Sequence, residues 1–196
     1  MPSIISHPAV PLALAPLLPQ ELRSPSVISL GIACSVLPDL DVVGFRFGVP
    51  YGHFLEHRGL SHSVAFAAFL STCLAWLLPI EAQGSCLILF GFLFSSTMSH
   101  GILDALTSGG LGVAFFAPLV NSRYFFPWRP IRVSPVSVSA FLSATGVRVL
   151  RSEVQWIQPP AVMAAVLLTR LTVKADLFAH LRRMASSAVS PLACHR

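Results

Sequence analysis

Uncharged apolar segments alternate with short polar connections along this chain of 196 residues. The two longest, residues 63–80 and 82–99, each run for eighteen residues without a charged side chain. A helix of that length rises about 27 Å, close to the roughly 30 Å of a bilayer's hydrocarbon core. Between them, Glu81-Ala82-Gln83-Gly84 is typical of a tight turn. The pattern predicts a helical hairpin through a membrane.

The other apolar segments are shorter. Residues 8–19 and 27–37 hold about a dozen residues each, fewer than the roughly 20 that span a bilayer, so we expect re-entrant, half-buried or core helices there. Residues 39–62 form a polar connection, residues 107–122 a glycine-rich loop or interfacial segment, and residues 125–135 suit the membrane–water interface. We predict one helix over 136–158 and a last helix from Pro159-Pro160, apolar to Leu168 and basic afterwards.

Composition places this pattern in a membrane. The chain is 54% hydrophobic and 11% charged, against about 25% charged in soluble domains. We therefore expect an all-α, polytopic membrane helical bundle, with one domain over 1–158 and a C-terminal helix and tail over 159–196. The net charge of +5 fits anionic membrane lipid as a partner better than nucleic acid, and no protein partner is indicated. The four cysteines show no CxxC spacing, so no disulfide framework is expected.

Seven ionisable side chains lie at the ends of the apolar segments, and the predicted chain reversals bring them together. The turn at 20–26 returns the chain to the level of its start, and the turn at 81–84 does so again. A site at one end of an antiparallel bundle would then collect His7, Asp39, Asp41, His57, His62, His100 and Asp104.

These residue types point to a metal. His100 and Asp104 are four residues apart and share a helical face. Imidazole and carboxylate together suit Zn²⁺ first, with Mn²⁺ and Fe²⁺ as alternatives. A divalent cation would also offset the cost of burying carboxylates in an apolar environment. Seven candidates exceed the ligands of one zinc ion, so we expect one to three ions able to activate water against phosphate esters.

Individual roles follow from chemistry and position. The expected metal ligands are Asp41, His57, His62, His100 and Asp104, followed by His7 and Asp39. A carboxylate not committed to metal, Asp39 or Glu56, is the expected general base. Arginines near the site are expected to bind a phosphate-bearing substrate: Arg58, Arg129 and Arg132.

Each assignment has a structural alternative. Asp39 could form a turn after Pro38, Arg58 could extend toward the interface, and Ser61 and Ser63 could cap a helix. Gly59 is expected to permit a tight turn. Three further histidines are expected to be interfacial: His53, His180 and His195.

The ordered motifs LPDLD, HRGLSH and SHGILDALTSGG, with the early His7, resemble the YdjM-like family of bacterial inner-membrane metal-dependent hydrolases. The downstream RYFFPWRPIRVSP and SEVQWI fit too, so the resemblance covers about residues 1–158. Ser61 stands where the family usually has Thr. The resemblance implies a multi-pass protein of the bacterial inner membrane.

More distantly, the chain is similar to zinc-dependent phospholipase C and the P1-type nucleases. His100 and Asp104 match their His-xxx-Asp pair, and Asp41 and His57 could match earlier ligands. Their later ligands have no clear equivalents here, since Glu153 is the only late carboxylate at a plausible place.

Arginine counts predict the orientation. Loops on the predicted site side hold Arg46, Arg58, Arg123, Arg129 and Arg132, and the opposite turns only Arg23, which places the site in the cytoplasm. The favoured function is hydrolysis of a phosphoester of a lipid or another membrane-adjacent substrate. The alternative is a non-catalytic protein with a structural metal site that binds a partner or serves in a stress response. A metal or proton transporter comes third, because its polar groups would lie near mid-membrane.

Overall fold

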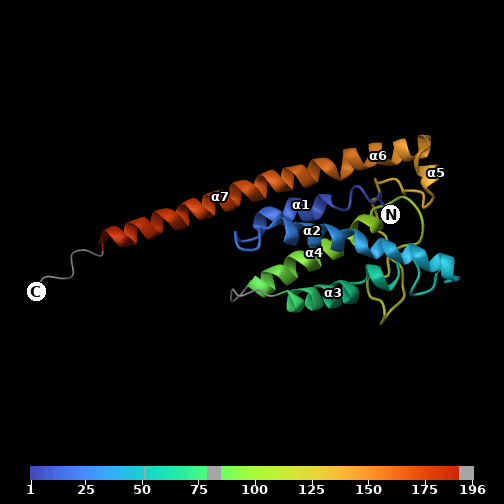
Figure 1. Cartoon of the computed structure of the whole chain (residues 1–196). Coiled ribbons are helices and arrows are strands. Elements are labelled where there is room, and N and C mark those ends of the chain that lie inside the picture. Colours follow the sequence, from blue (N-terminus) through green and yellow to red (C-terminus); the bar gives the residue numbers. More distant parts are fainter. Residues whose placement is uncertain (51, 79–84, 190–196) are drawn as a thin grey trace, which may run out of the picture.

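The computed structural model describes residues 1–50, 52–78 and 85–189, and within this part of the chain the fold is all-helical without β-strands (Figure 1). The predicted turn at 81–84 and His195 lie outside the described residues. The elements are α1 (Ala9–Leu14), η1 (Ala15–Leu17), α2 (Pro25–Val36), η2 (Leu37–Phe47), η3 (Leu60–His62), α3 (Val64–Leu77), α4 (Ser85–Ala105), α5 (Val138–Phe141), α6 (Ala144–Trp156) and α7 (Gln158–Val189).

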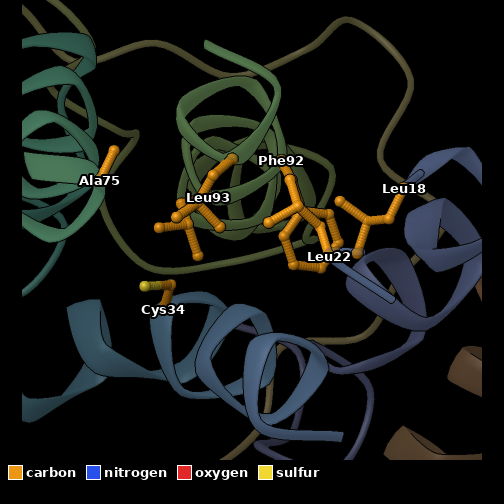
Figure 2. Close-up of a cluster of buried hydrophobic side chains, with 7 residues drawn as sticks. Leu18, Leu22, Cys34, Ala75, Phe92 and Leu93 are labelled. Carbon is orange, nitrogen blue, oxygen red and sulfur yellow. The ribbon is translucent and has the colours of Figure 1, made fainter. Parts of the chain in front are cut away.

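Helix α4 is the centre of the bundle, because it packs against both α2 and α3. Gly31 allows α2 to approach closely, since a Cβ there would lie 2.5 Å from the Phe92 ring. Figure 2 shows the resulting core, in which Phe92 and Leu93 of α4 meet Cys34 of α2, Ala75 of α3 and the Leu18–Leu22 turn. Burial of these side chains fixes the helices relative to one another.

Among the described residues, two helical runs are long and apolar enough to cross a membrane: Pro25–Phe47, formed by α2 and η2, with 23 residues, and α4 with 21. The expectation of a short second segment is therefore wrong, because the chain stays helical through LPDLD until Gly48, whose φ of 79° ends η2. Helix α3 is shorter than predicted, with 14 residues, or about 21 Å. Large apolar side chains on α3 and α4 face outward, as a hydrocarbon environment requires: Phe69, Trp76, Leu77 and Leu87.

The C-terminal third follows the predicted order with different boundaries. Instead of one helix over 136–158 there are two, α5 and α6, because Ser143 adopts an extended backbone and its side chain caps α6 at Thr145 N–H. Helix α7 begins at Gln158, just before the two prolines, and packs along α1. In Figure 1, α6 and α7 form one long rod beside the bundle.

Candidate metal centre

The seven predicted side chains meet at one end of the helices. His7 precedes α1, Asp39 and Asp41 lie in η2, and His100 and Asp104 lie in the last turns of α4. His57 comes from the loop before η3, and His62 ends η3. Gly59 permits that loop, because a Cβ there would lie 2.2 Å from the Phe54 carbonyl oxygen. The loop and the ends of the helices therefore bring these side chains together at one end of the bundle.

One group of four side chains is arranged as a metal site would be. Ligand atoms of Asp39, His62, His100 and Asp104 all lie within 4.8 Å of one another. Nδ1 of His100 is 2.7 Å from the Ser35 carbonyl oxygen, so Nδ1 carries the proton and donates it. The other nitrogen, Nε2, lies 3.2 Å from Asp39 Oδ1.

His7 adds a further imidazole to this group. Its ring stacks on that of His100, with centroids 3.8 Å apart and planes at 9°. Its Nε2 lies 3.9 Å from Asp39 Oδ2. Complete burial, and then the neighbouring His100, hold the pKa of His7 well below its usual range, so the ring is neutral and able to bind a cation at neutral pH.

A second group shares His62 with the first. It consists of Asp41, His57 and His62. Asp41 Oδ1 is 2.8 Å from Nδ1 of His57, and its Oδ2 is 3.2 Å from Nδ1 of His62. Asp39 and Asp41 therefore belong to different groups, because a 3₁₀ helix of three residues per turn separates positions two apart.

The two serines of HRGLSHS divide their roles. Ser63 caps α3 by accepting from Phe66 N–H at 3.1 Å, as expected. Ser61 does not cap that helix; its hydroxyl donates to Asp41 Oδ2 and lies 2.9 Å from Nδ1 of His62. Ser61 thus orients a carboxylate of the second group.

The protein surrounds His62 with negative charge. Burial by itself lowers the pKa of the imidazole, but contacts with Asp104 and Asp41 outweigh it and raise the pKa to about 9. The two ring nitrogens lie 3.2 Å from Asp41 Oδ2 and 3.5 Å from Asp104 Oδ2. The environment therefore favours a positive charge at this point, whether a proton or a metal ion carries it.

Buried polar atoms without hydrogen bonds converge on the first group. They are both ring nitrogens of His7, both carboxylate oxygens of Asp39 and of Asp104, and Nε2 of His62 and of His100. Two of them face cationic groups of the chain, because Asp104 Oδ2 lies 3.1 Å from Arg58 Nε and Asp104 Oδ1 lies 3.7 Å from the N-terminal ammonium. Buried polar atoms cost free energy unless a partner satisfies them, and a bound cation would satisfy the ligand atoms that face it.

Arg58 belongs to the framework of the site. It is buried, with a backbone φ of 69°. Its Nε lies 3.1 Å from Asp104 Oδ2, and its other nitrogens donate to Thr107 Oγ1 and to the carbonyls of Gly109 and Leu111. With every nitrogen engaged, this guanidinium orients Asp104 and ties the loop after α4 to the site.

The remaining predicted residues lie outside the two groups. Glu56 is buried and pairs with Arg123 at 2.9 Å, so the structure does not bring this carboxylate to the candidate metal ligands. Arg129 is exposed and lies over the Phe125 ring at 4.7 Å from its centroid. Arg132 is exposed too, and only its backbone N–H bonds to α6, at Ser152 Oγ.

Glu153 has a role that the sequence did not reveal. From α6, its buried carboxylate accepts hydrogen bonds from the backbone N–H and hydroxyl of Ser3 and from the hydroxyl of Ser6. It anchors the segment that carries His7. A lone carboxylate in the amphipathic SEVQWI segment was the one available signal, and it did not name partners about 150 positions away.

Comparisons with known proteins identify the family of the chain. A model of the family described as YdjM inner membrane protein matches residues 1–177. Inner membrane protein YbcI of Escherichia coli (strain K12) is 35% identical over 163 residues, which cover 83% of this chain and 94% of the relative. No solved structure shows significant similarity to the chain. The chain is therefore a membrane protein, and it belongs to the YdjM inner membrane protein family.

Proposed function

We propose that this protein is a multi-pass, metal-dependent hydrolase of the inner membrane that cleaves a phosphoester of a lipid or another membrane-adjacent substrate. One observation carries the proposal: buried carboxylate oxygens and imidazole nitrogens converge without hydrogen-bond partners on Asp39, His62, His100 and Asp104. Asp39 and Asp104 supply negative charge to the group, although Asp104 also faces Arg58 and the N-terminal ammonium. Mixed nitrogen and oxygen ligands favour Zn²⁺ over Mg²⁺ or Ca²⁺.

Different residues of the chain would bind metal, act as the general base and orient the ligands. Either His62, His100 and Asp104 would hold an ion, or Asp41, His57 and His62 would, because a neutral imidazole offers a lone pair on one nitrogen only. A bound divalent ion supplies a Lewis acid and lowers the pKa of water. Asp39 is the better general base of the two candidates, because its oxygens face the group without hydrogen bonds, whereas Glu56 pairs with Arg123. Ser35, Ser61 and Arg58 hold the ligands in orientation.

A structural metal site is the second candidate, and burial favours it. His7, His100 and Asp104 have no exposed surface, and a closed shell of protein ligands is typical of structural zinc. Catalysis needs an open position beside the ion. Asp39 supports a catalytic site over a structural one, because it also lines a surface cavity.

Metal content and hydrolysis, measured together, separate these functions. We expect the purified wild-type protein to retain stoichiometric Zn²⁺ by elemental analysis, and His100→Ala and Asp104→Ala to lose it. The same samples are assayed on phosphomonoesters and phosphodiesters, with and without a chelator. Wild-type protein without bound metal contradicts the proposal. Bound metal with no hydrolysis of any ester supports the structural site.

Orientation is part of the proposal. Arg58 is buried in the framework, so four loop arginines remain on the site side: Arg46, Arg123, Arg129 and Arg132. The opposite end has Arg23 in its turn, and α7 adds Arg170 and Lys174 near that turn. The loops, counted without α7, favour a cytoplasmic site.

A cysteine at the exposed position 122, between α4 and α5, tests this orientation. In a background with the native cysteines changed to serine, we expect Ser122→Cys to react with a membrane-impermeant maleimide in inverted vesicles and not in intact spheroplasts. Residue 21, exposed in the turn at the opposite end, provides the matched control, and Glu21→Cys is expected to show the reverse pattern. Labelling of Ser122→Cys in spheroplasts contradicts the cytoplasmic site.

A further inference from the structure

A cavity of about 350 Å³ opens beside the candidate metal centre. It lies between the N-terminal segment, η2 and the stretch that leads into α5, which meet at one end of the molecule in Figure 1. Its wall is apolar and includes Ile4, Val36, Leu40, Val136, Val138 and Phe141. The volume is at the lower end of the range of about 300–1,000 Å³ for ligand sites, enough for part of an amphiphile.

The polar groups in this wall are not equivalent. Ser3 Oγ donates to Glu153, Ser134 Oγ donates to the Pro135 carbonyl, and Ser137 Oγ accepts from Ala140 N–H. Asp39 also lines the cavity, and neither of its carboxylate oxygens has a hydrogen-bond partner. Its side chain is more than nine-tenths buried and belongs to the four-residue group. The cavity therefore connects an apolar wall with the one metal-site carboxylate that reaches it.

We propose that this cavity binds the hydrocarbon chain of a single-chain phosphoester amphiphile and presents its headgroup at Asp39. The inference deepens the proposed function, on which it rests for the headgroup chemistry. The apolar wall matches a hydrocarbon chain, because each methylene that leaves water for an apolar cavity favours binding. In an inner membrane protein, lipid chains are the abundant apolar ligand, and Val36 and Leu40 belong to a run apolar enough to lie in the bilayer.

Photolabelling tests the cavity without requiring catalysis. The full-length protein, in nanodiscs of phosphatidylethanolamine and phosphatidylglycerol, receives a lysophosphatidic acid with a diazirine in its chain. After illumination we expect adducts concentrated in residues 36–42 and 134–141. Unlabelled lysophosphatidic acid should compete, and glycerol 3-phosphate, which has the headgroup and no chain, should not. Equal competition by both, or adducts spread over the outer faces of α3 and α4, overturns the proposal.

Substitutions that fill the cavity test the same proposal, and a substitution outside the cavity is their control. Val138→Trp and, independently, Val136→Trp should reduce labelling about tenfold, the effect of displacing roughly two methylenes. Val147→Trp, at an exposed position of α6 outside the cavity, should leave it unchanged. Labelling unaffected by both filling variants overturns the proposal. Bound metal, measured on the same samples, separates the two ideas: labelling that survives in a wild-type protein without metal supports the cavity and contradicts the proposed function.

Discussion

Replacing Asp39 by asparagine is expected to stabilise the metal-free protein and to weaken Zn²⁺ binding about 100-fold or more, equivalent to about 2.7 kcal/mol. Both effects have one cause. The Asp39 carboxylate is buried against His7 and His100, and neither of its oxygens has a hydrogen-bond partner. Without a cation, burial of this charge costs desolvation free energy. With a cation, the carboxylate acts as a ligand or as a base beside the ligands.

The size of the stabilisation follows from the same argument. Relieving one uncompensated buried group is worth about 1 kcal/mol, which shifts the melting temperature of a chain of this size by roughly 2–4 °C. Thermal unfolding of wild type and Asp39→Asn, each with chelator and with Zn²⁺, measures both effects. The two curves should cross: the variant unfolds later with chelator and earlier with Zn²⁺.

Two features allow the effect on the buried charge to be separated from other effects of the substitution. The substitution preserves the shape of the side chain, so packing in η2 is unchanged. Asp176→Asn is the matched control, because Asp176 is exposed on α7 and lines a different cavity at the Leu17–Arg23 turn. If Asp39 instead pairs with protonated histidines, the variant is destabilised in chelator, and that outcome contradicts a metal centre at Asp39.

The gathering of the site could be predicted because it depends on chain reversals. His7, LPDLD, HRGLSH and the end of α4 lie at the starts and ends of apolar segments, and an antiparallel bundle brings such positions to one end. The i, i+4 spacing of His100 and Asp104 gave the local geometry. Hydrophobic patterning therefore predicted the helical class and the place of the site.

The remaining features depend on tertiary contacts that patterning does not encode. LPDLD reads as a turn because of Pro38, yet proline is compatible with the first turn of a helix, and η2 continues α2. Arg58 looks like a substrate-binding residue by charge, but its partners Thr107, Gly109 and Leu111 lie about 50 positions away. The break at Ser143 arises from a capping serine in an otherwise helical stretch.

Glu153→Ala is expected to destabilise the protein by about 3–5 kcal/mol, because it leaves three buried donors without an acceptor. These donors are Ser3 N–H, Ser3 Oγ and Ser6 Oγ. The expected fall in melting temperature is roughly 10 °C. Glu153→Gln retains one carbonyl acceptor, so its melting temperature should lie between those of Glu153→Ala and wild type. Glu21→Ala, at an exposed position, should have the melting temperature of wild type.

Tryptophan fluorescence reports on this region directly. Trp156 lies one turn after Glu153 in α6 and packs edge-on against Trp128, with ring centroids 5.0 Å apart. We expect Glu153→Ala to shift the emission to longer wavelengths before global unfolding, because the anchored segment and α6 separate first. An unchanged spectrum and melting temperature would show that the buried carboxylate does not hold the N-terminal segment.

Glu153→Ala should also weaken metal binding, through its effect on His7. Ser6 precedes His7, whose ring stacks on His100, so loss of the anchor removes His7 and leaves Asp39, His62, His100 and Asp104 in place. Zn²⁺ affinity should therefore fall about tenfold, the size of a positioning effect, and not be abolished. Adding His7→Ala to Glu153→Ala should then cause no further loss of affinity, whereas additive losses would mean that Glu153 acts on the site independently of His7.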